Sequence, residues 1–415
     1  MLFYLSRLAF IQPFILVSMS RFHSYINTAT KLIETYKGDK PFAVYIKQFF
    51  SENKKYGAKD RRQISSLCYN YFRIGFSEAG IPLNEKMLMG TFLCNQEPCD
   101  LLEKLAPEWN AKISLPLDIK IDSIKPAFSV TDIFPFAAEL SDGISLVEFC
   151  KSFLAQPALF IRVRPQVSNA VFRKLEKSIF VYQLIGEDCI QLANSDKVEE
   201  YFILDKEVVV QDYNSQKVLD YLKEHPQAVD SGDSNSKLNL SVWDCCAASG
   251  GKSILLHDIV NRKIDLTVSD IRADIILNLH RRFKKAGIKE YKYFIADITI
   301  PEFKPGELNF DLVICDAPCS GSGTWSRTPE QLCFFKKESI DEYNHLQKKI
   351  VSKVIPYLRK GGVLIYITCS VFKKENEMVS DFISEDLNCK LLHQQLLKGY
   401  DKKADNMFVA VFEKL

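Results

Sequence analysis

The chain has 415 residues, of which 47% are hydrophobic, and its basic residues exceed its acidic ones by only two charges. This length favours two or three domains. Because the net charge is close to zero, it gives no reason by itself to expect a nucleic-acid or membrane partner. Twelve cysteines are scattered without regular spacing, which indicates a reduced, cytoplasmic protein rather than a disulfide scaffold. Because no Cys-x-x-Cys pair occurs, we predict no structural metal.

Residues 1–20 are interpreted as a doubtful N-terminal extension. The stretch from Leu2 to Val17 is apolar but contains Arg7 and Pro13, and it is short for a membrane span, which needs about 20 apolar residues. No small-x-small cleavage site follows, as a signal peptide requires. We therefore favour Met19 as the true start, with a membrane anchor as the alternative.

Residues 21–125 are predicted to form a helical domain, because apolar residues such as Phe42, Ile46 and Phe49 recur at helical spacing. The basic, polar run from Lys54 to Arg62 precedes another amphipathic stretch. This run indicates either a solvated face or a phosphate-contacting patch of an RNA-binding module, and both interpretations stay open.

Residues 126–235 are predicted to form a small α+β domain. Pro157 to Arg164 alternates apolar residues with arginines and is typical of a strand, and Val208 to Val210 indicates another. The stretch from Val171 to Lys177 between them is predicted to be helical. Residues Asp230 to Lys237 are polar and turn-rich, which indicates a linker or surface loop.

Residues 236–415 alternate between strand and helix patterns. The expected strands are Leu240–Trp243, Leu266–Ser269, Tyr291–Ile295, Phe310–Cys315 and Val363–Ile367, and the expected helices are Ser253–Val260, Arg272–Ala286 and Ser339–Leu358. This alternation predicts an α/β fold with a doubly wound, Rossmann-type sheet. In such sheets ligands bind beyond the carboxyl ends of the strands, where the chemically interesting residues of this region lie.

A turn of small residues, Asp244 to Ser253, joins the first of these strands to its helix. Small residues let the backbone approach a ligand, and the helix N-terminus adds amide donors. Asp270 ends the next strand, where an acid can accept hydrogen bonds from ribose hydroxyls, and Asp297 follows the third strand, where an acid can accept from an adenine amino group. This arrangement favours a nucleoside cofactor over a triphosphate.

Two other interpretations of this turn remain. Gly250-Gly251-Lys252-Ser253 ends like a phosphate-binding P-loop, but the glycine required five positions before Gly251 is replaced by Cys246. The second alternative is a plain connection between a strand and a helix.

Two cysteines follow strands in this region. Asp316-Ala317-Pro318-Cys319 places a carboxylate and a thiol on one rigid turn, and Cys369 follows another strand. A single cysteine at a strand end is usually a buried small hydrophobe. Two of them with an aspartate favour covalent chemistry on an electron-poor ring: a thiolate adds to carbon 6 of cytosine, carbon 5 becomes nucleophilic, and a partner at ring nitrogen 3 stabilises the developing charge.

These stretches resemble the Nol/Nop/Sun (RsmB-like) family of RNA cytosine-5 methyltransferases. The residues that carry the resemblance are Asp244–Ser253, Asp311–Thr324 and Tyr366–Glu377. The basic run ending at Arg62 resembles, more weakly, the NusB-like helical domain of bacterial members. One departure is Ser249, where the family usually has proline, and it affects the expected rigidity of the turn.

The resemblance implies S-adenosylmethionine as the methyl donor and RNA, ribosomal more than transfer, as the substrate. It implies Cys369 as the nucleophile, Cys319 as the group that aids release, and Asp316 as the residue that holds the base edge. The implied cofactor-binding residues are Cys246, Ala247, Ala248, Ser249, Gly250, Gly251, Lys252, Asp270, Asp297 and Asp316. The target cytosine must be unstacked or single-stranded.

Several basic residues near these motifs are candidates for a phosphate track, and each is also an ordinary solvated charge: Arg281, Arg282, Lys284, Lys285, Lys336, Lys337, Lys348, Lys349, Lys373 and Lys374. A monomer is favoured, and no membrane partner is expected. The rival function is a non-catalytic RNA-binding ribosome-assembly factor that retains the methyltransferase fold, and an intact set of Cys369, Cys319 and Asp316 argues against it.

Overall fold

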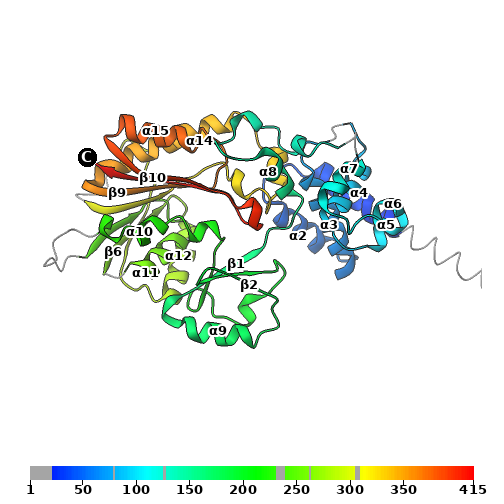
Figure 1. Cartoon of the computed structure of the whole chain (residues 1–415), viewed down its shortest axis with the longest axis horizontal. Helices are drawn as coiled ribbons and strands as arrows, with labels where there is room; N and C mark the ends of the chain where they lie inside the picture. Colours follow the sequence, from blue (N-terminus) through cyan, green and yellow to red (C-terminus); the bar gives the residue numbers. More distant parts are fainter. Residues whose placement is uncertain (1–20, 78–79, 125–127, 230–238, 261–262, 304–308) are drawn as a thin grey trace, which may run out of the picture. The chain divides into compact units, whose positions relative to one another are not determined.

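A computed structural model describes residues 21–77, 80–124, 128–229, 239–260, 263–303 and 309–415 (Figure 1). The doubtful extension and the predicted linker at Asp230–Lys237 lie outside these ranges. The chain packs as two compact units. The helical unit comprises the chain up to Ala137, Ser145–Gln156 and Trp325–Phe335, and the sheet unit comprises Ala138–Ile144, Pro157–Thr324 and Lys336–Leu415. The sequence prediction divides the same chain into three domains, of which the α+β domain and the Rossmann-type domain both lie mostly in the sheet unit.

The helical unit confirms the predicted helical N-terminal region. Residues 21–35 are helical, followed by α2 (Phe42–Glu52), α3 (Ala58–Arg73), α4 (Leu83–Cys94), α5 (Asp100–Leu105), α6 (Pro107–Asn110), α7 (Leu117–Ile124), α8 (Leu146–Phe153) and α13 (Glu330–Phe334). Its core contains edge-to-face aromatic pairs, such as Tyr36 with Phe42 at 5.0 Å and Tyr36 with Phe334 at 5.1 Å between ring centroids. Such pairs add about 0.5–1.5 kcal/mol each beyond the area they bury.

A small antiparallel sheet forms the first part of the sheet unit. Its strand order is β2-β3-β1-β4, from β1 (Leu159–Val163), β2 (Gln183–Ile185), β3 (Cys189–Leu192) and β4 (Val208–Val210). Helix α9 (Ser168–Glu176) contributes Val171 and Leu175 to the same hydrophobic core as Ile161 and Ile190. Both predicted strands and the predicted helix are therefore present here.

A seven-stranded mixed sheet forms the second part, and it confirms the predicted α/β, Rossmann-type fold. Its strand order is β10-β11-β9-β8-β5-β6-β7. Five strands pair in parallel: β5 (Leu240–Asp244), β6 (Ile264–Asp270), β7 (Lys292–Ile295), β8 (Phe310–Asp316) and β9 (Leu358–Thr368). Strand β11 (Met407–Lys414) runs antiparallel to both of its neighbours, β9 and the edge strand β10 (Cys389–Leu397). The order reverses between β5 and β8, which is where such sheets bind ligands.

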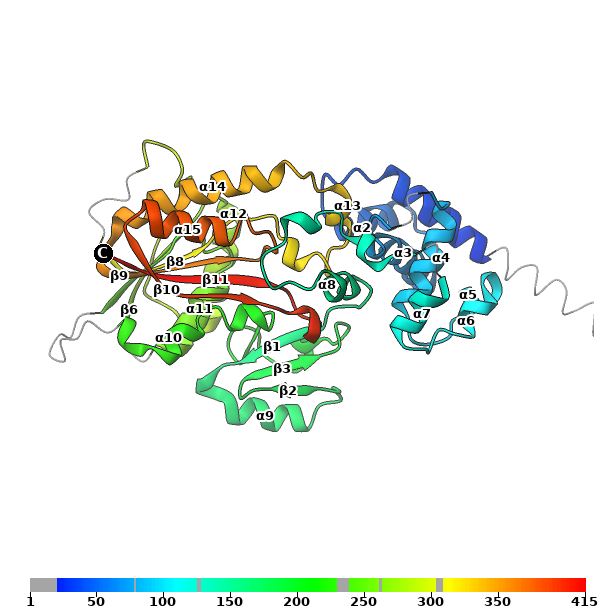
Figure 2. The same cartoon turned by 45° about the horizontal axis from the view of Figure 1, so that its top comes forward.

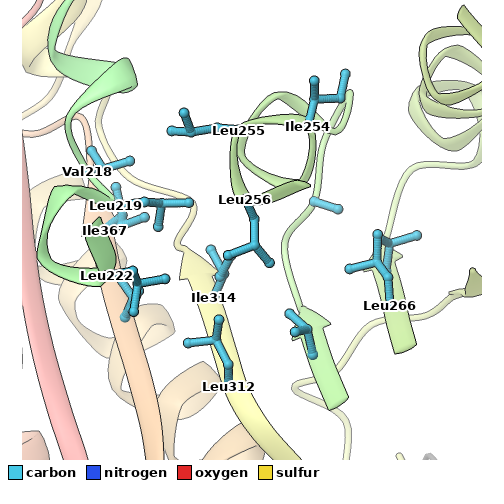
Figure 3. Close-up of a cluster of buried hydrophobic side chains, with 14 of the residues drawn as sticks. Val218, Leu219, Leu222, Ile254, Leu255, Leu256, Leu266, Leu312, Ile314 and Ile367 are labelled. Atoms are coloured by element: carbon cyan, nitrogen blue, oxygen red, sulfur yellow. The ribbon is translucent and has the colours of Figure 1, made fainter. Parts of the chain in front are cut away.

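Helices cover both faces of this sheet (Figures 1 and 2). One face carries α10 (Asp220–Glu224), α11 (Gly251–Ile259) and α12 (Ala273–Ala286), and the other carries α14 (Ser339–Val354) and α15 (Glu377–Asp386). Strand β8 alternates accordingly: Leu312 and Ile314 belong to the first core, and Val313 belongs to the second. Figure 3 shows side chains of α11 and β8 gathered in the first core. Each fully buried aliphatic side chain contributes roughly 1.5–3 kcal/mol.

The boundaries differ from the prediction near Gly361. The helix expected to reach Leu358 ends at Val354, and a 3-10 turn, Ile355–Tyr357, follows. Pro356 lies in this turn and has no backbone N–H to continue the helix. Strand β9 then begins at Leu358 and passes through Gly361, whose φ of +71° suits glycine. No helix within the described ranges is long and apolar enough to cross a membrane.

Candidate active site

The turn from Asp244 to Ser253, here called the cofactor turn, has a backbone that depends on glycine. Gly250 caps α11 with a φ of +82°, and a Cβ atom there would lie 2.4 Å from Cε1 of Phe283. Ala248 also has a positive φ, of +46°. The turn is held to the neighbouring strand because the backbone N–H of Ala248 donates to Oδ2 of Asp270 at 3.0 Å. The sequence therefore forms a close-fitting loop at the carboxyl end of β5.

Asp244, at the end of β5, is a fully buried carboxylate, and only one of its two oxygens has a hydrogen-bond partner among the described residues. Its Oδ2 accepts a hydrogen bond from Ser253 Oγ at 2.6 Å, whereas Oδ1 has no partner among the described residues. Burial raises the pKa of Asp244 to about 7, and the Ser253 hydrogen bond opposes part of this shift. An unpartnered buried carboxylate oxygen is costly, so this atom is suited to a positively charged or hydrogen-donating ligand.

The two acids predicted to meet a nucleoside have different surroundings. Burial raises the pKa of Asp270, but hydrogen bonds from the Arg272 side chain and backbone outweigh it, so the pKa is lowered overall. Asp297 accepts from the Thr299 N–H at 2.8 Å and from the Thr299 hydroxyl at 2.7 Å, and the hydroxyl hydrogen bond is the main cause of its lowered pKa. Both carboxylates are therefore charged acceptors at neutral pH.

Ser249, which stands where the resembling family has proline, is fixed by a side chain from α12. Arg282 Nη1 donates to the Ser249 hydroxyl at 2.9 Å and to its carbonyl at 3.2 Å, and the same guanidinium contacts Asp205 at 2.8 Å. Arg282 was a candidate for phosphate contact, and the structure places it inward, with its side chain 18% exposed. Hydrogen bonds to this arginine therefore hold the turn where a proline ring would stiffen it.

Lys252 and Asp316 form an ion pair across the site. The Lys252 Nζ lies 2.5 Å from Asp316 Oδ2, and both side chains are largely buried. Burial lowers the pKa of Lys252, but the charge of Asp316 outweighs it and raises the pKa overall. The same ammonium group also interacts electrostatically with Cys369. The cofactor turn therefore carries a lasting positive charge that interacts with Cys369.

The two predicted cysteines, here called the thiol pair, lie side by side. Cys319 Sγ is 3.3 Å from Cys369 Sγ, and both residues are half-buried. The contact with Cys369, followed by burial, raises the pKa of Cys319 well above its ordinary value. Cys319 therefore keeps its proton at neutral pH.

A buried carboxylate holds the two loops that carry the thiol pair. Glu375 accepts from the Ser320 N–H at 2.8 Å, from the Ser370 hydroxyl at 2.8 Å and from Gln347 at 3.0 Å. Gln347, on α14, also donates to the carbonyl of Pro318 at 3.0 Å. Burial raises the pKa of Glu375, and the hydrogen bonds from Ser320 oppose this. The residues that follow each cysteine are thus tied to one acceptor.

A second set of contacts fixes the backbone at Cys369. The Gly323 N–H donates to the Cys369 carbonyl at 2.9 Å, and Asn376 donates to the Ser370 carbonyl at 2.9 Å. The Ala317 N–H donates to the Ile367 carbonyl at 2.9 Å. The carbon skeleton around both sulfurs is therefore fixed by hydrogen bonds before any substrate binds, as a preorganised site requires.

Three lysines of the expected phosphate track have acidic partners. Lys337 pairs with Glu139 at 3.0 Å, Lys373 with Asp142 at 2.8 Å, and Lys374 with Asp341 at 2.6 Å. These pairs are solvent-exposed to different degrees and contribute little to stability. The positive charge available to a phosphate backbone beside the thiol pair is therefore smaller than the sequence indicates.

The residues of the site fit a nucleoside cofactor with a positive charge. The unpartnered oxygen of Asp244 lies at the start of the cofactor turn, and the charged acceptors Asp270 and Asp297 follow the neighbouring strands. Gly251 leaves room, since a Cβ there would meet nothing closer than 3.8 Å. The turn and the neighbouring strand ends therefore offer acceptors and space that suit such a cofactor.

The region that contains the cofactor turn and the thiol pair is similar to a known protein family. Residues 235–411 match the family described as 16S rRNA methyltransferase RsmB/F. This part of the chain is therefore similar to the RsmB/F methyltransferases. The resemblance to the Nol/Nop/Sun group is thereby confirmed.

Two curated relatives of the RsmB/F region illustrate how far the similarity extends. The chain is 32% identical over 182 residues to ribosomal RNA small subunit methyltransferase B of Proteus mirabilis, covering 42% of each protein. It is 29% identical over 206 residues to the probable ribosomal RNA small subunit methyltransferase B of Bacillus subtilis, covering 48% of this chain and 42% of that protein. The matched part of the chain thus spans about two fifths of the length of these relatives.

Solved structures share the fold. PH0851 superposes with a TM-score of 0.66 at 20% identity, covering 94% of this chain and 98% of that one. NSun6 from Pyrococcus horikoshii, crystallised with SFG, gives a TM-score of 0.53 at 14% identity, covering 65% of this chain and 94% of that one. These likenesses support the Rossmann-type architecture over most of the chain.

Some functional side chains were missed by reasoning from sequence. Asp244 and Glu375 lie inside the sequence motifs, but their patterns predict no role for them, although both are buried and hydrogen-bonded at the site. An acid at the end of the first apolar strand was an available signal for Asp244. The contact of Arg282 with Ser249 joins residues 33 positions apart and has no local signal.

Proposed function

We propose that this protein is an RNA methyltransferase that uses S-adenosylmethionine to methylate carbon 5 of a cytosine in small-subunit ribosomal RNA. The observation that carries the proposal is the thiol pair, with 3.3 Å between the Cys369 and Cys319 sulfurs, beside the Lys252–Asp316 ion pair. The similarity of the matched region to the RsmB/F family supports RNA methylation, and the names of the relatives indicate ribosomal RNA. SFG, an analogue of S-adenosylmethionine, in the NSun6 structure supports the cofactor.

The first step of the proposed reaction uses Cys369. Its thiolate adds to carbon 6 of a flipped-out cytosine, which forms a carbon–sulfur bond and makes carbon 5 nucleophilic. The Lys252 ammonium interacts electrostatically with Cys369, and the carboxylate of Asp316 is suited to hold the base edge by accepting a hydrogen bond from the exocyclic amino group. S-adenosylmethionine supplies the methyl group when it is bound.

The second step releases the product. A base removes the proton from carbon 5, the carbon 5–carbon 6 double bond re-forms, and the bond to Cys369 breaks with its electron pair returning to sulfur. Cys319 keeps its proton at neutral pH and lies in contact with that sulfur, so it can protonate the leaving thiolate. Replacing Cys319 therefore stalls release rather than attack.

The proposal is tested by methyl transfer and by adduct formation with two variants. With labelled donor and unmodified small-subunit RNA, the wild-type chain should transfer label, and both Cys369→Ala and Cys319→Ala should lower the rate by at least ~10³-fold. Only Cys319→Ala should accumulate a protein–RNA adduct that survives denaturing gel electrophoresis. Cys99→Ala, a half-buried cysteine of the helical unit, serves as the matched control and should keep full activity.

Two results would contradict this proposal. An adduct with Cys369→Ala but not with Cys319→Ala would mean that the roles are reversed. RNA binding without any transfer by the wild-type chain, across ribosomal and transfer RNA, would favour the assembly-factor alternative.

A further inference from the structure

A second group of sulfurs lies next to the cofactor turn, formed by Cys245, Cys246 and Cys315 and here called the sulfur trio. Their three Sγ atoms all lie within 4.8 Å of one another. None of them is the nucleophile or the proton donor of the proposed methyl transfer, and only Cys246 is among the implied cofactor-binding residues. The sequence predicted no metal site because no Cys-x-x-Cys pair occurs, and this group is assembled instead from two separate strands.

The pairing of two parallel strands brings the sulfur trio together. Asp244 of β5 is paired with Ile314 of β8, and the Cys245 N–H donates to the Ile314 carbonyl at 3.0 Å. Cys245 and Cys315 are therefore adjacent in register, so their side chains point to the same face of the sheet. Cys246 follows directly and completes the group from the cofactor turn.

The surroundings of the sulfur trio are apolar and closed on one side. Cys245 is 2% exposed and Cys315 is 0% exposed, and both pack in the core beneath α14 and α15 with Ala317 and Tyr366. Cys246 is half-buried, so the group is not wholly enclosed by the core. No His, Asp or Glu in the described ranges joins the three sulfurs at the same spacing.

This donor set selects one class of ligand. Structural zinc sites are almost always four-coordinate, whereas soft monovalent copper is selected by thiolates. Metal–sulfur distances of roughly 2.3 Å place three sulfurs about 4 Å apart around one ion, which the observed spacing allows with little movement. We propose that Cys245, Cys246 and Cys315 form a three-sulfur binding site for Cu(I). Each sulfur that becomes a thiolate ligand releases its proton to solvent.

The site is tested with Cu(I) alone, added under argon to the full chain in competition with a colorimetric Cu(I) chelator. The thiol pair is a second possible sulfur ligand set, so the titration is repeated on a Cys319→Ser/Cys369→Ser variant. Both proteins should retain one Cu(I) per chain, and X-ray absorption should show three sulfur neighbours. Cys389→Ser, at a buried cysteine elsewhere in the sheet unit, should retain the ion equally well.

Replacement of the trio should remove this binding. Cys245→Ser/Cys315→Ser should weaken Cu(I) retention by at least ~100-fold, with folding checked by circular dichroism. If the double variant does not fold, Cys246→Ser provides a second test at a half-buried position. Its X-ray absorption spectrum should then show two sulfur neighbours instead of three. Loss of the ion from the Cys319→Ser/Cys369→Ser variant would overturn the proposal, as would preferential binding of Zn(II) by the wild-type chain.

Discussion

At the scale of single residues, Asp244 gives a pH dependence to cofactor binding. Burial raises its pKa to about 7, so the carboxylate is charged above this pH and neutral below it. The proposed cofactor is cationic, and we expect its affinity to fall as pH decreases from 8 to 6, by up to ~10-fold per unit below 7. Calorimetric titration of S-adenosylmethionine at pH 6, 7 and 8 measures this.

The control for this prediction is Asp244→Asn, which removes the titrating group. Its affinity should be low and nearly constant over the same pH range. Asp270 cannot account for the effect, because its lowered pKa keeps it charged throughout. An affinity of the wild-type chain that does not change with pH would show that Asp244 does not face the cofactor.

The residues that sequence reasoning selected share one property. Cys319 and Asp316 lie on one short turn, and Cys369 follows a recognisable strand, so local patterns reveal them. Asp244 was harder to interpret because its unpartnered oxygen is a property of the folded core. The sulfur trio was not predicted for the same reason, since Cys315 meets Cys246 only through strand pairing.

At the scale of elements, the 3-10 turn Ser322–Thr324 supports the loop of Cys369. A Cβ on Gly323 would lie 2.1 Å from the Asn406 carbonyl oxygen and 2.9 Å from that of Cys369. Both are backbone atoms, so Gly323→Ala must displace one of the loops. We expect a loss of roughly 1–3 kcal/mol in the free energy of unfolding and about 10²-fold in methyl transfer. Urea denaturation and the transfer assay measure these changes.

Gly80→Ala is the matched control for this prediction, because a Cβ there meets no atom within 4 Å. It should change the free energy of unfolding by less than about 1 kcal/mol. This control separates the steric effect from the loss of unfolded-state entropy that any glycine-to-alanine change produces. Normal transfer by Gly323→Ala would show that the position of the Cys369 loop is not critical.

The elements that sequence patterns predicted are those with a regular apolar run and a clear end. Helix α12 ends at Ala286, as predicted, and Gly287 follows in the left-handed conformation that is typical of a C-cap. Strands β10 and β11 were not predicted. In β10, Lys390, His393 and Gln394 interrupt the apolar residues, and only pairing with β11 makes this stretch a strand. Pairing partners distant in sequence are not visible in a single stretch.

At the scale of the whole molecule, a buried charge cluster joins the small sheet to the Rossmann-type part. Asp258 of α11 lies 2.6 Å from Arg162 and 2.7 Å from Arg164 of the small sheet, with all three side chains at most 7% exposed. Asp258→Ala leaves two buried cations without their acidic partner, so we expect a loss of about 3–5 kcal/mol in the free energy of unfolding. Denaturant titration measures it.

An exposed ion pair provides the comparison. Asp265→Ala removes the partner of Lys292, whose side chain is 62% exposed, and should cost less than about 1 kcal/mol. Equal effects of the two substitutions would mean that the Asp258 cluster does not join the two sheets energetically.

The position of β11 in the sheet has a consequence for damaged versions of the protein. Strand β11 lies between β9 and β10, although it follows both in the chain. A frameshift between β10 and β11 would therefore leave β9 with a bare hydrogen-bonding edge and β10 with no strand to join. Unpaired edges of this kind recruit other chains. We expect such truncated products to accumulate as insoluble aggregates rather than as inactive but folded enzyme.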